Sequence, residues 1–181
     1  MAIVFELSAE CSGTNDCAAL VKHFHGLQMT LLTGRTISWK ASEVDHSTAM
    51  SAHSPDLSMY GVRTLQDALE LTESGIRLYH HLKNGPAFRF ARVALEAGLV
   101  ELAELRHWVA PMADGECRFE IECAVDESLY REMGSPQFCY PFRDGYRWTR
   151  YRGEQYLPLY SRDQNELNAL CRSLFPEYFQ Y

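Results

Sequence analysis

The residues best suited to catalysis in this chain are the histidines of a serine-rich stretch. His46 and His53 lie there, close in sequence to Asp45 and Asp56. Imidazole groups beside carboxylates are typical of general acid–base sites and of metal sites. One hypothesis is therefore an enzyme that uses the His46/His53 loop, although the chain contains no G-x-S-x-G, no H-E-x-x-H and no glycine-rich phosphate loop.

The second candidate for chemistry is Cys17, in the first turn of an expected helix. A helix N-terminus lowers the pKa of a thiol and makes it a better nucleophile. However, His23 and His25 lie too far along the same helix to act as its base. The cysteines at 11, 17, 117, 123, 139 and 171 have no spacing typical of a zinc site. We therefore predict free thiols, no metal and no cofactor.

Two histidine groupings, His23-x-His25 and His80-His81, lie near the ends of expected helices. Residues one or two positions apart on a helix do not face each other, so neither grouping forms a chelate by itself. A histidine near a helix C-terminus is stabilised by the helix macrodipole. We interpret both groupings as structural.

The negative charge of the chain is concentrated in one segment. The 181 residues have a net charge of −7, and the stretch from Glu96 to Glu132 alone contains ten acids and three bases. The rest of the chain, with 14 acids and 14 bases, is neutral. A concentrated negative field disfavours nucleic acid and attracts a basic partner.

The centre of this segment has the pattern of an amphipathic strand. From Cys117 to Val125, apolar residues alternate with Arg118, Glu120, Glu122 and Ala124. A period of two is typical of a strand with one buried face and one face in water. We expect the water-facing side to be the middle of a protein-binding surface. The predicted partner-binding residues are the carboxylates and aromatic side chains around it: Glu101, Glu104, Trp108, Glu120, Glu122, Asp126, Glu127 and Tyr130.

One other stretch, FRDGYRWTRYRGEQY, is basic and aromatic. Such a composition can bind single-stranded nucleic acid by stacking. Its period of two instead places Arg147 and Thr149 on one side of a strand and Tyr146 and Trp148 on the other. Because the chain as a whole is acidic, we predict an ordinary amphipathic strand and no nucleic acid partner.

The elements that must position these residues are hairpins and separate helices. Since the strands do not alternate with helices, we predict an α+β fold in which an antiparallel sheet built from hairpins carries three to four helices mainly on one face. Residues 99–109 fit either a helix or a strand. The expected helices cover 17–25, 64–83, 126–133 and 164–174. Thr64 and Asp67 resemble a capping box for the second of these helices, and Asp126 starts the third. The expected strands cover 2–7, 27–32, 35–40, 87–95, 117–125 and a meander over 137–160, with a turn at Thr33-Gly34.

We expect one domain over 1–181, with a subdivision near 97–115 as the alternative and an exposed loop over 41–61. No stretch approaches the ~18 consecutive apolar residues of a membrane-spanning helix. The N-terminus MAIVFELSAE lacks the features of a secretory signal. We therefore expect a cytoplasmic protein with no membrane partner.

The size of the chain, its acidic stretches FEIECAVDE and LVELAEL, its aromatic content of 12% and the lack of a catalytic motif form a profile. This profile resembles small bacterial immunity proteins, which pair with secreted or type VI effector toxins. The resemblance implies a cytosolic inhibitor that forms a tight complex with a cognate toxin domain, often a basic nuclease. The alternatives are an enzyme that uses the His46/His53 loop or Cys17, and a secretion adaptor or chaperone.

Overall fold

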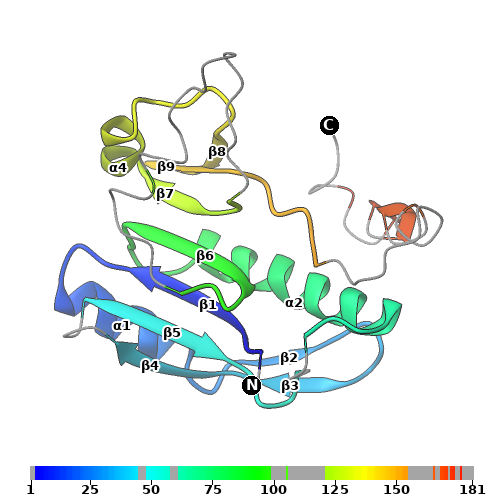
Figure 1. Cartoon of the computed structure of the whole chain (residues 1–181). Coiled ribbons are helices and arrows are strands. Elements are labelled where there is room, and N and C mark those ends of the chain that lie inside the picture. Colours follow the sequence, from blue (N-terminus) through cyan, green and yellow to red (C-terminus); the bar gives the residue numbers. More distant parts are fainter. Residues whose placement is uncertain are drawn as a thin grey trace.

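A computed structural model describes residues 3–44, 48–57, 61–98, 105, 121–154, 165, 168–170, 172–173 and 176 (Figure 1). Seven strands form an antiparallel sheet in the order β4-β5-β1-β6-β7-β9-β8, and β2 and β3 form a separate hairpin. The predicted α+β fold is confirmed. In chain order the elements are β1 (Phe5–Glu10), α1 (Thr14–Phe24), β2 (Gln28–Thr30), β3 (Thr36–Ser38), β4 (Lys40–Val44), β5 (Ala49–His53), α2 (Leu65–Lys83), β6 (Phe90–Leu95), β7 (Ala124–Asp126), α4 (Glu127–Glu132), β8 (Tyr140–Arg143) and β9 (Tyr146–Trp148).

One side of the sheet, which we call the α1/α2 face, is apolar and is covered by α1 and α2. Phe5, Leu7 and Ala9 of β1 are buried on this side. The register places Leu7 opposite Ala52 of β5 and Val93 of β6, which belong to the same core. In Figure 1, α2 runs behind β6. The main hydrophobic core therefore lies between the sheet and the two long helices.

The other side of the sheet, which we call the α4 face, carries polar side chains over some strands and apolar side chains over others. Glu6 and Ser8 of β1 point to it, because successive residues of a strand face opposite sides. Toward β7 it becomes apolar, where Phe90 and Val125 form a smaller core with Leu129 of α4. The α4 face is thus polar over β1 and apolar beneath α4.

The helix α2 begins at the capping box that its sequence predicts. Thr64 Oγ1 accepts the N–H of Asp67 at 3.1 Å, and the Asp67 carboxylate accepts the N–H of Thr64 at 3.0 Å. These two bonds satisfy N–H groups that the first turn of a helix leaves without partners. The predicted helix over 64–83 is confirmed.

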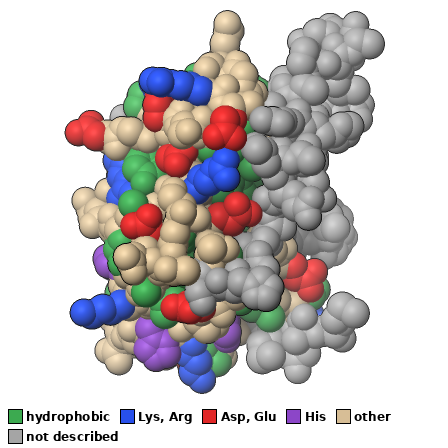
Figure 2. All heavy atoms as spheres, turned by 90° about the vertical axis from the view of Figure 1, so that its left-hand side faces the viewer, with side chains coloured by type: hydrophobic (Ala, Val, Ile, Leu, Met, Phe, Trp, Pro, Cys, Tyr) green, Lys and Arg blue, Asp and Glu red, His purple; other side chains and the backbone are tan. Residues whose placement is uncertain are grey.

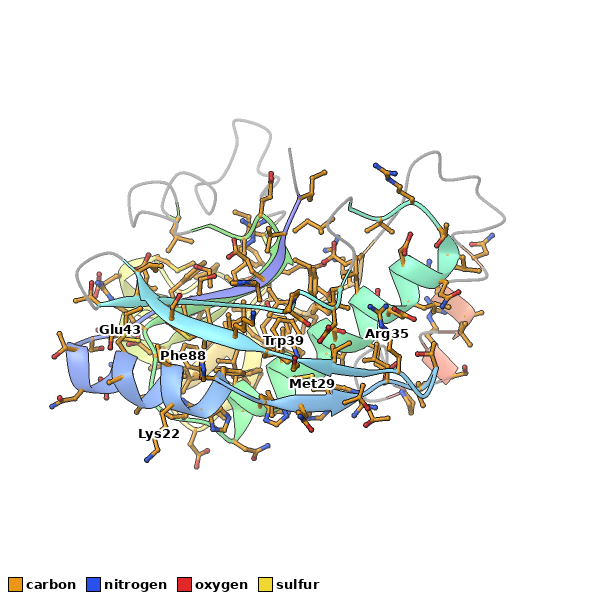
Figure 3. All side chains as sticks on the ribbon, turned by 90° about the horizontal axis from the view of Figure 1, so that it is seen from below. Lys22, Met29, Arg35, Trp39, Glu43 and Phe88 are labelled. Atoms are coloured by element: carbon orange, nitrogen blue, oxygen red, sulfur yellow. The ribbon has the colours of Figure 1, made fainter. Side chains whose placement is uncertain are left out.

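Two buried carboxylates of α2 fix the β2–β3 hairpin. Glu73 accepts the N–H of Leu32 at 2.9 Å and pairs with Arg77 at 2.6 Å. Glu70 pairs at 2.9 Å with Arg35, whose side chain reaches toward α2 in Figure 3. Both glutamates are almost fully buried, which is tolerable because each is paired and hydrogen-bonded.

A buried tyrosine extends the short pairing between β6 and β7. In the described part of the chain these strands share two residue pairs, the last of them Ala91 with Ala124. Two residues further along, the N–H of Val93 donates to Tyr79 Oη at 3.3 Å, and Tyr79 Oη donates to the carbonyl of Glu122 at 3.1 Å. The phenol therefore bridges the strands where they separate.

Several further local predictions are confirmed, although α1 begins at Thr14 and β1 runs to Glu10, beyond the predicted bounds. The predicted turn at Thr33-Gly34 joins β2 and β3, and Gly34 has a φ of 82°, which favours glycine. Asp126 caps α4, and in β9 Trp148 is buried in the main core while Arg147 is not. The predicted strand over 155–160 and all of 99–109 except Leu105 lie outside the described residues. Within the predicted helix over 164–174, the described residues 165, 168–170 and 172–173 are helical.

The predicted exposed loop over 41–61 is wrong for most of its described residues. This part of the chain contains β4 and β5, which pair with each other, and β5 pairs with β1. Ala41, Met50 and Ala52 are buried in the main core. Their alternation with Ser42 and Ser51 is a strand pattern, but small alanines and serines carry too little hydrophobic contrast for sequence reasoning to detect it.

The predicted water-facing side of the strand over 117–125 is also wrong at its described end. Residues 117–120 lie outside the described residues, but Ala124 and Val125 of β7 are both buried. β7 lies between β6 and β9, with the main core on one side and the smaller core on the other. A strand inside a sheet that is covered on both sides cannot present an alternating face to water.

The Tyr79 bridge provides a test of this arrangement. The Tyr79→Phe variant is expected to lower the free energy of unfolding by ~1–3 kcal/mol, because the N–H of Val93 and the carbonyl of Glu122 would be left buried without a partner. Urea unfolding followed by circular dichroism measures the difference. Tyr140→Phe is the matched control, since Tyr140 is exposed on β8, and equal stability of Tyr79→Phe and the wild type would contradict the bridge.

Candidate functional site

The structure brings three of the predicted partner-binding residues together and separates a fourth from them. Asp126, Glu127 and Tyr130 gather at α4, on the α4 face. Glu122 lies before β7 and bonds instead with the segment that follows β9. The other predicted residues lie outside the described part of the chain: Glu101, Glu104, Trp108 and Glu120.

The side chains at α4 form a network of their own. The Asp126 carboxylate accepts the N–H of Leu129 at 2.6 Å and so caps the helix. Glu127 pairs with Arg147 of β9 at 3.3 Å and with Arg131 at 3.5 Å. The Arg147 guanidinium lies 5.4 Å from the centre of the Tyr130 ring. The charges of this network are therefore locally balanced.

Figure 2 views the end of the molecule that lies at the left of Figure 1, and acidic and basic side chains alternate over it. Glu132 of α4 follows the same pattern, since it pairs with Arg89 at 2.9 Å. Tyrosine and arginine side chains held in place by neighbours are common centres of binding energy at protein interfaces. This part of the surface suits contact with a partner better than long-range attraction of one.

The structure gives Glu122 an environment that the sequence pattern does not predict. Its carboxylate is largely buried and accepts the N–H of Arg152 at 2.8 Å. Burial raises its pKa to about 8, and the nearby Glu154 adds to this effect. Burial therefore favours the protonated form of Glu122 near neutral pH. The prediction that Glu122 is a water-facing anion is wrong.

Glu154 is a second buried carboxyl group in the same region, and sequence reasoning missed it. Its side chain accepts the hydroxyl of Tyr151 at 2.9 Å, and its N–H donates to Thr72 Oγ1 of α2 at 2.9 Å. Burial raises its pKa as well. The sequence does contain one indication of this packing, the glycine at position 75 inside α2. A Cβ added to Gly75 would lie 2.5 Å from the Tyr151 ring. An isolated glycine within a helix often marks such a close approach.

The cysteine proposed as a nucleophile is placed unfavourably for that role. Cys17 is fully buried, and its Sγ donates to the carbonyl of Ala49 at 3.2 Å. Burial raises its pKa, whereas a nucleophilic cysteine needs a lowered one. The neighbouring Cys11, which shares a hydrogen bond with it, has a pKa raised to about 12 by burial and by Cys17. This environment is typical of a structural thiol.

Of the two histidines proposed for catalysis, His46 lies outside the described residues. His53 ends β5 and lines an open recess of about 430 Å³ together with Val4, Glu6, Glu96 and Gly98. Across the described ranges, no three His, Cys, Asp or Glu side chains are arranged to hold a metal ion. The recess nevertheless collects two carboxylates and one imidazole, from residues that lie far apart in the sequence.

The structure also joins two histidines that the sequence analysis treated separately. The rings of His23 on α1 and His81 on α2 lie 5.7 Å apart between centroids. Burial lowers the pKa of His81, and His23 adds to this. The pair packs against Phe24, so it forms part of the contact between the two helices.

Comparison with protein-family models, with curated proteins and with solved structures finds no match to this chain. Among the helices of the described residues, none is both long enough and apolar enough to cross a membrane.

The buried carboxyl of Glu122 predicts how stability depends on pH. Its pKa in the folded protein, about 8, lies above the ordinary value of 4.5, so the folded state binds this proton more tightly than the unfolded state. Its contribution to stability is complete below the ordinary pKa and is lost as the pH rises toward 8. Near neutral pH the free energy of unfolding should fall by up to ~1.4 kcal/mol per pH unit on account of this group.

Urea unfolding of the wild type and of Glu122→Gln between pH 5 and pH 9 isolates this effect. The amide cannot ionise, so the variant should gain stability relative to the wild type as the pH rises. Two curves that stay parallel over this range would show that the carboxyl of Glu122 does not titrate as proposed.

Proposed function

We propose that this protein binds a basic protein partner through the α4 face and thereby neutralises it, as an immunity protein does for its cognate toxin. The observation that carries the proposal is the charge distribution. The segment from Glu96 to Glu132 alone accounts for the net charge of −7. A local excess of one sign accelerates encounter with a partner of the opposite sign and selects against partners of the same sign.

The described anchor points of this acidic segment support the choice of face. Its first acid, Glu96, lines the recess beside Glu6 on the α4 face. Further along, Leu105 and Ile121 belong to the small core or pack against it, beneath α4. The described residues of the segment, Glu96, Leu105 and Ile121, therefore lie on this face, whereas α1 and α2 occupy the other face.

The structure narrows the set of residues for which we propose contact. Glu122 is removed from the steering set because its carboxylate is bound to the N–H of Arg152 and burial raises its pKa. Asp126 is occupied in capping α4. The proposed contact residues are those that remain, with Arg147 added because it is held against Tyr130 and Glu127: Glu101, Glu104, Trp108, Glu120, Glu127, Tyr130 and Arg147.

This proposal includes a cytoplasmic location and a basic toxin domain, such as a nuclease, as the partner. Immunity genes lie beside the genes of their toxins, so the product of the adjacent reading frame is the probe. Co-expression should abolish the toxicity of that product, and calorimetry should show a stoichiometric complex. A secretion adaptor would instead keep its partner unfolded without abolishing toxicity.

Charge reversal locates the interface. Glu127→Lys and Glu120→Lys together are expected to weaken the affinity at least ~10-fold and to make binding less sensitive to salt. Glu43→Lys, on the edge strand β4, is the matched control and should leave affinity unchanged. If the adjacent product is harmless, or if it binds the double variant as tightly as the wild type, the proposal fails.

A further inference from the structure

The recess on the α4 face has a defined position and size. It is formed where the start of β1, the end of β5 and the turn after β6 meet, and it is lined by Val4, Glu6, His53, Glu96 and Gly98. Its volume of about 430 Å³ lies within the ~300–1,000 Å³ typical of sites for small groups. The strand register explains the grouping, because Glu6 lies directly opposite His53.

Glu6 is held in a fixed orientation within this recess. Its Oε2 accepts the hydroxyl of Ser51 at 2.6 Å, and its Oε1 accepts the N–H of Gly98 at 3.3 Å. A carboxylate accepts about four hydrogen bonds. These two donors therefore orient the group and leave further acceptor positions available to a ligand.

Glu96 is placed at the recess by the turn after β6. The turn is fixed on both sides of it, since the N–H of Glu96 donates to the carbonyl of Val4 at 2.7 Å and Arg92 Nη1 donates to the carbonyl of Ala97 at 3.0 Å. Glu96 itself has a φ of 49°, in the left-handed region that side chains other than glycine seldom adopt. The second carboxylate of the recess is therefore set by an ordered backbone.

The chemistry of the lining selects a cation. Among the ion pairs of the described residues, none involves Glu6 or Glu96. The nearby Arg92 directs its guanidinium to a backbone carbonyl. Two carboxylates on one rim attract an ammonium or guanidinium group, and Val4 offers an apolar wall for an aliphatic stem.

We propose that this recess receives a lysine or arginine side chain of the partner protein and so anchors the complex. This inference rests on the proposed function, since it names the contact made at the start of the acidic segment. A side chain of the partner is favoured over a free metabolite because the recess is open and shares its carboxylate Glu96 with the segment that carries the excess charge.

The recess can be tested without the partner. Blocked arginine (N-acetyl-arginine N-methylamide) is titrated into the labelled full chain while the ring resonances of His53 are followed by NMR, and blocked citrulline serves as the neutral probe of equal shape. Blocked arginine should shift the His53 resonances with saturation, and blocked citrulline should not. Equal responses to both probes would overturn the proposal.

Matched variants test whether the response to blocked arginine arises at Glu6 and Glu96. The double variant Glu6→Gln/Glu96→Gln removes both charges, and it should lose the response to blocked arginine. The amide that replaces the Glu6 carboxylate can still accept the N–H of Gly98 through its oxygen, and its NH2 group can donate to the Ser51 hydroxyl, which is able to accept. Glu10→Gln, on the same strand and face but outside the recess, should retain it. Thermal unfolding of each variant confirms the fold, and Glu96→Gln alone, at an exposed turn, provides a second variant that preserves the strand.

The same variants separate the two proposals when the adjacent gene product is used. Loss of at least ~10-fold in affinity for the double variant, with Glu10→Gln unchanged, supports the anchor. If the partner binds the double variant as tightly as the wild type, the anchor is wrong while the neutralising function stands. If blocked arginine binds but the adjacent product does not, the recess is a cation site and the neutralising function is wrong.

Discussion

The fold depends most on the way Tyr79 joins α2 to the second half of the sheet. Its hydroxyl lies between the N–H of Val93 and the carbonyl of Glu122, two groups that would otherwise be expected to pair directly. Its ring contacts those of Trp148 and Tyr151, with centroids 5.5 and 5.6 Å away. One fully buried side chain thus holds the helix, both strand edges and the segment after β9 in a single packing unit.

This arrangement accounts for the unusual surroundings of Glu122. Because β7 separates from β6 at the phenol, Glu122, two residues before β7, does not face water as a residue of an isolated strand would. It is instead enclosed beside Glu154 and Tyr151, where burial opposes ionisation. The acidic character of the segment 96–132 consequently resides in its other carboxylates. The binding surface that we propose is therefore less centred on β7 than the alternation in the sequence suggests.

Sequence reasoning succeeded where the determining interactions are local. The capping box of Thr64 and Asp67, the turn at Gly34 and the cap at Asp126 each involve residues within four positions, and each is present in the structure. Sequence reasoning failed where the interactions that determine the structure join residues far apart in the sequence. The strands β4 and β5 are recognisable only through their pairing with each other and the pairing of β5 with β1. The surroundings of Glu122 depend on Arg152 and Glu154, which lie about thirty residues further along the chain. The recess of Glu6, His53 and Glu96 joins three separate elements, which no spacing in the sequence reveals.

The short contact between β6 and β7 has a consequence for how the molecule opens. The strands β4, β5, β1 and β6 are joined by long ladders, whereas the ladder between β6 and β7 has two residue pairs, extended by the phenol bridge and by the bond from the N–H of Asp126 to the carbonyl of Arg89. Regions joined by few contacts often unfold as separate cooperative units. The amide protons of β8 and β9 should then exchange with solvent through partial unfolding, whereas those of β1 should exchange only when the whole chain unfolds. A partner that contacts both α4 and the recess would span this boundary and suppress such openings.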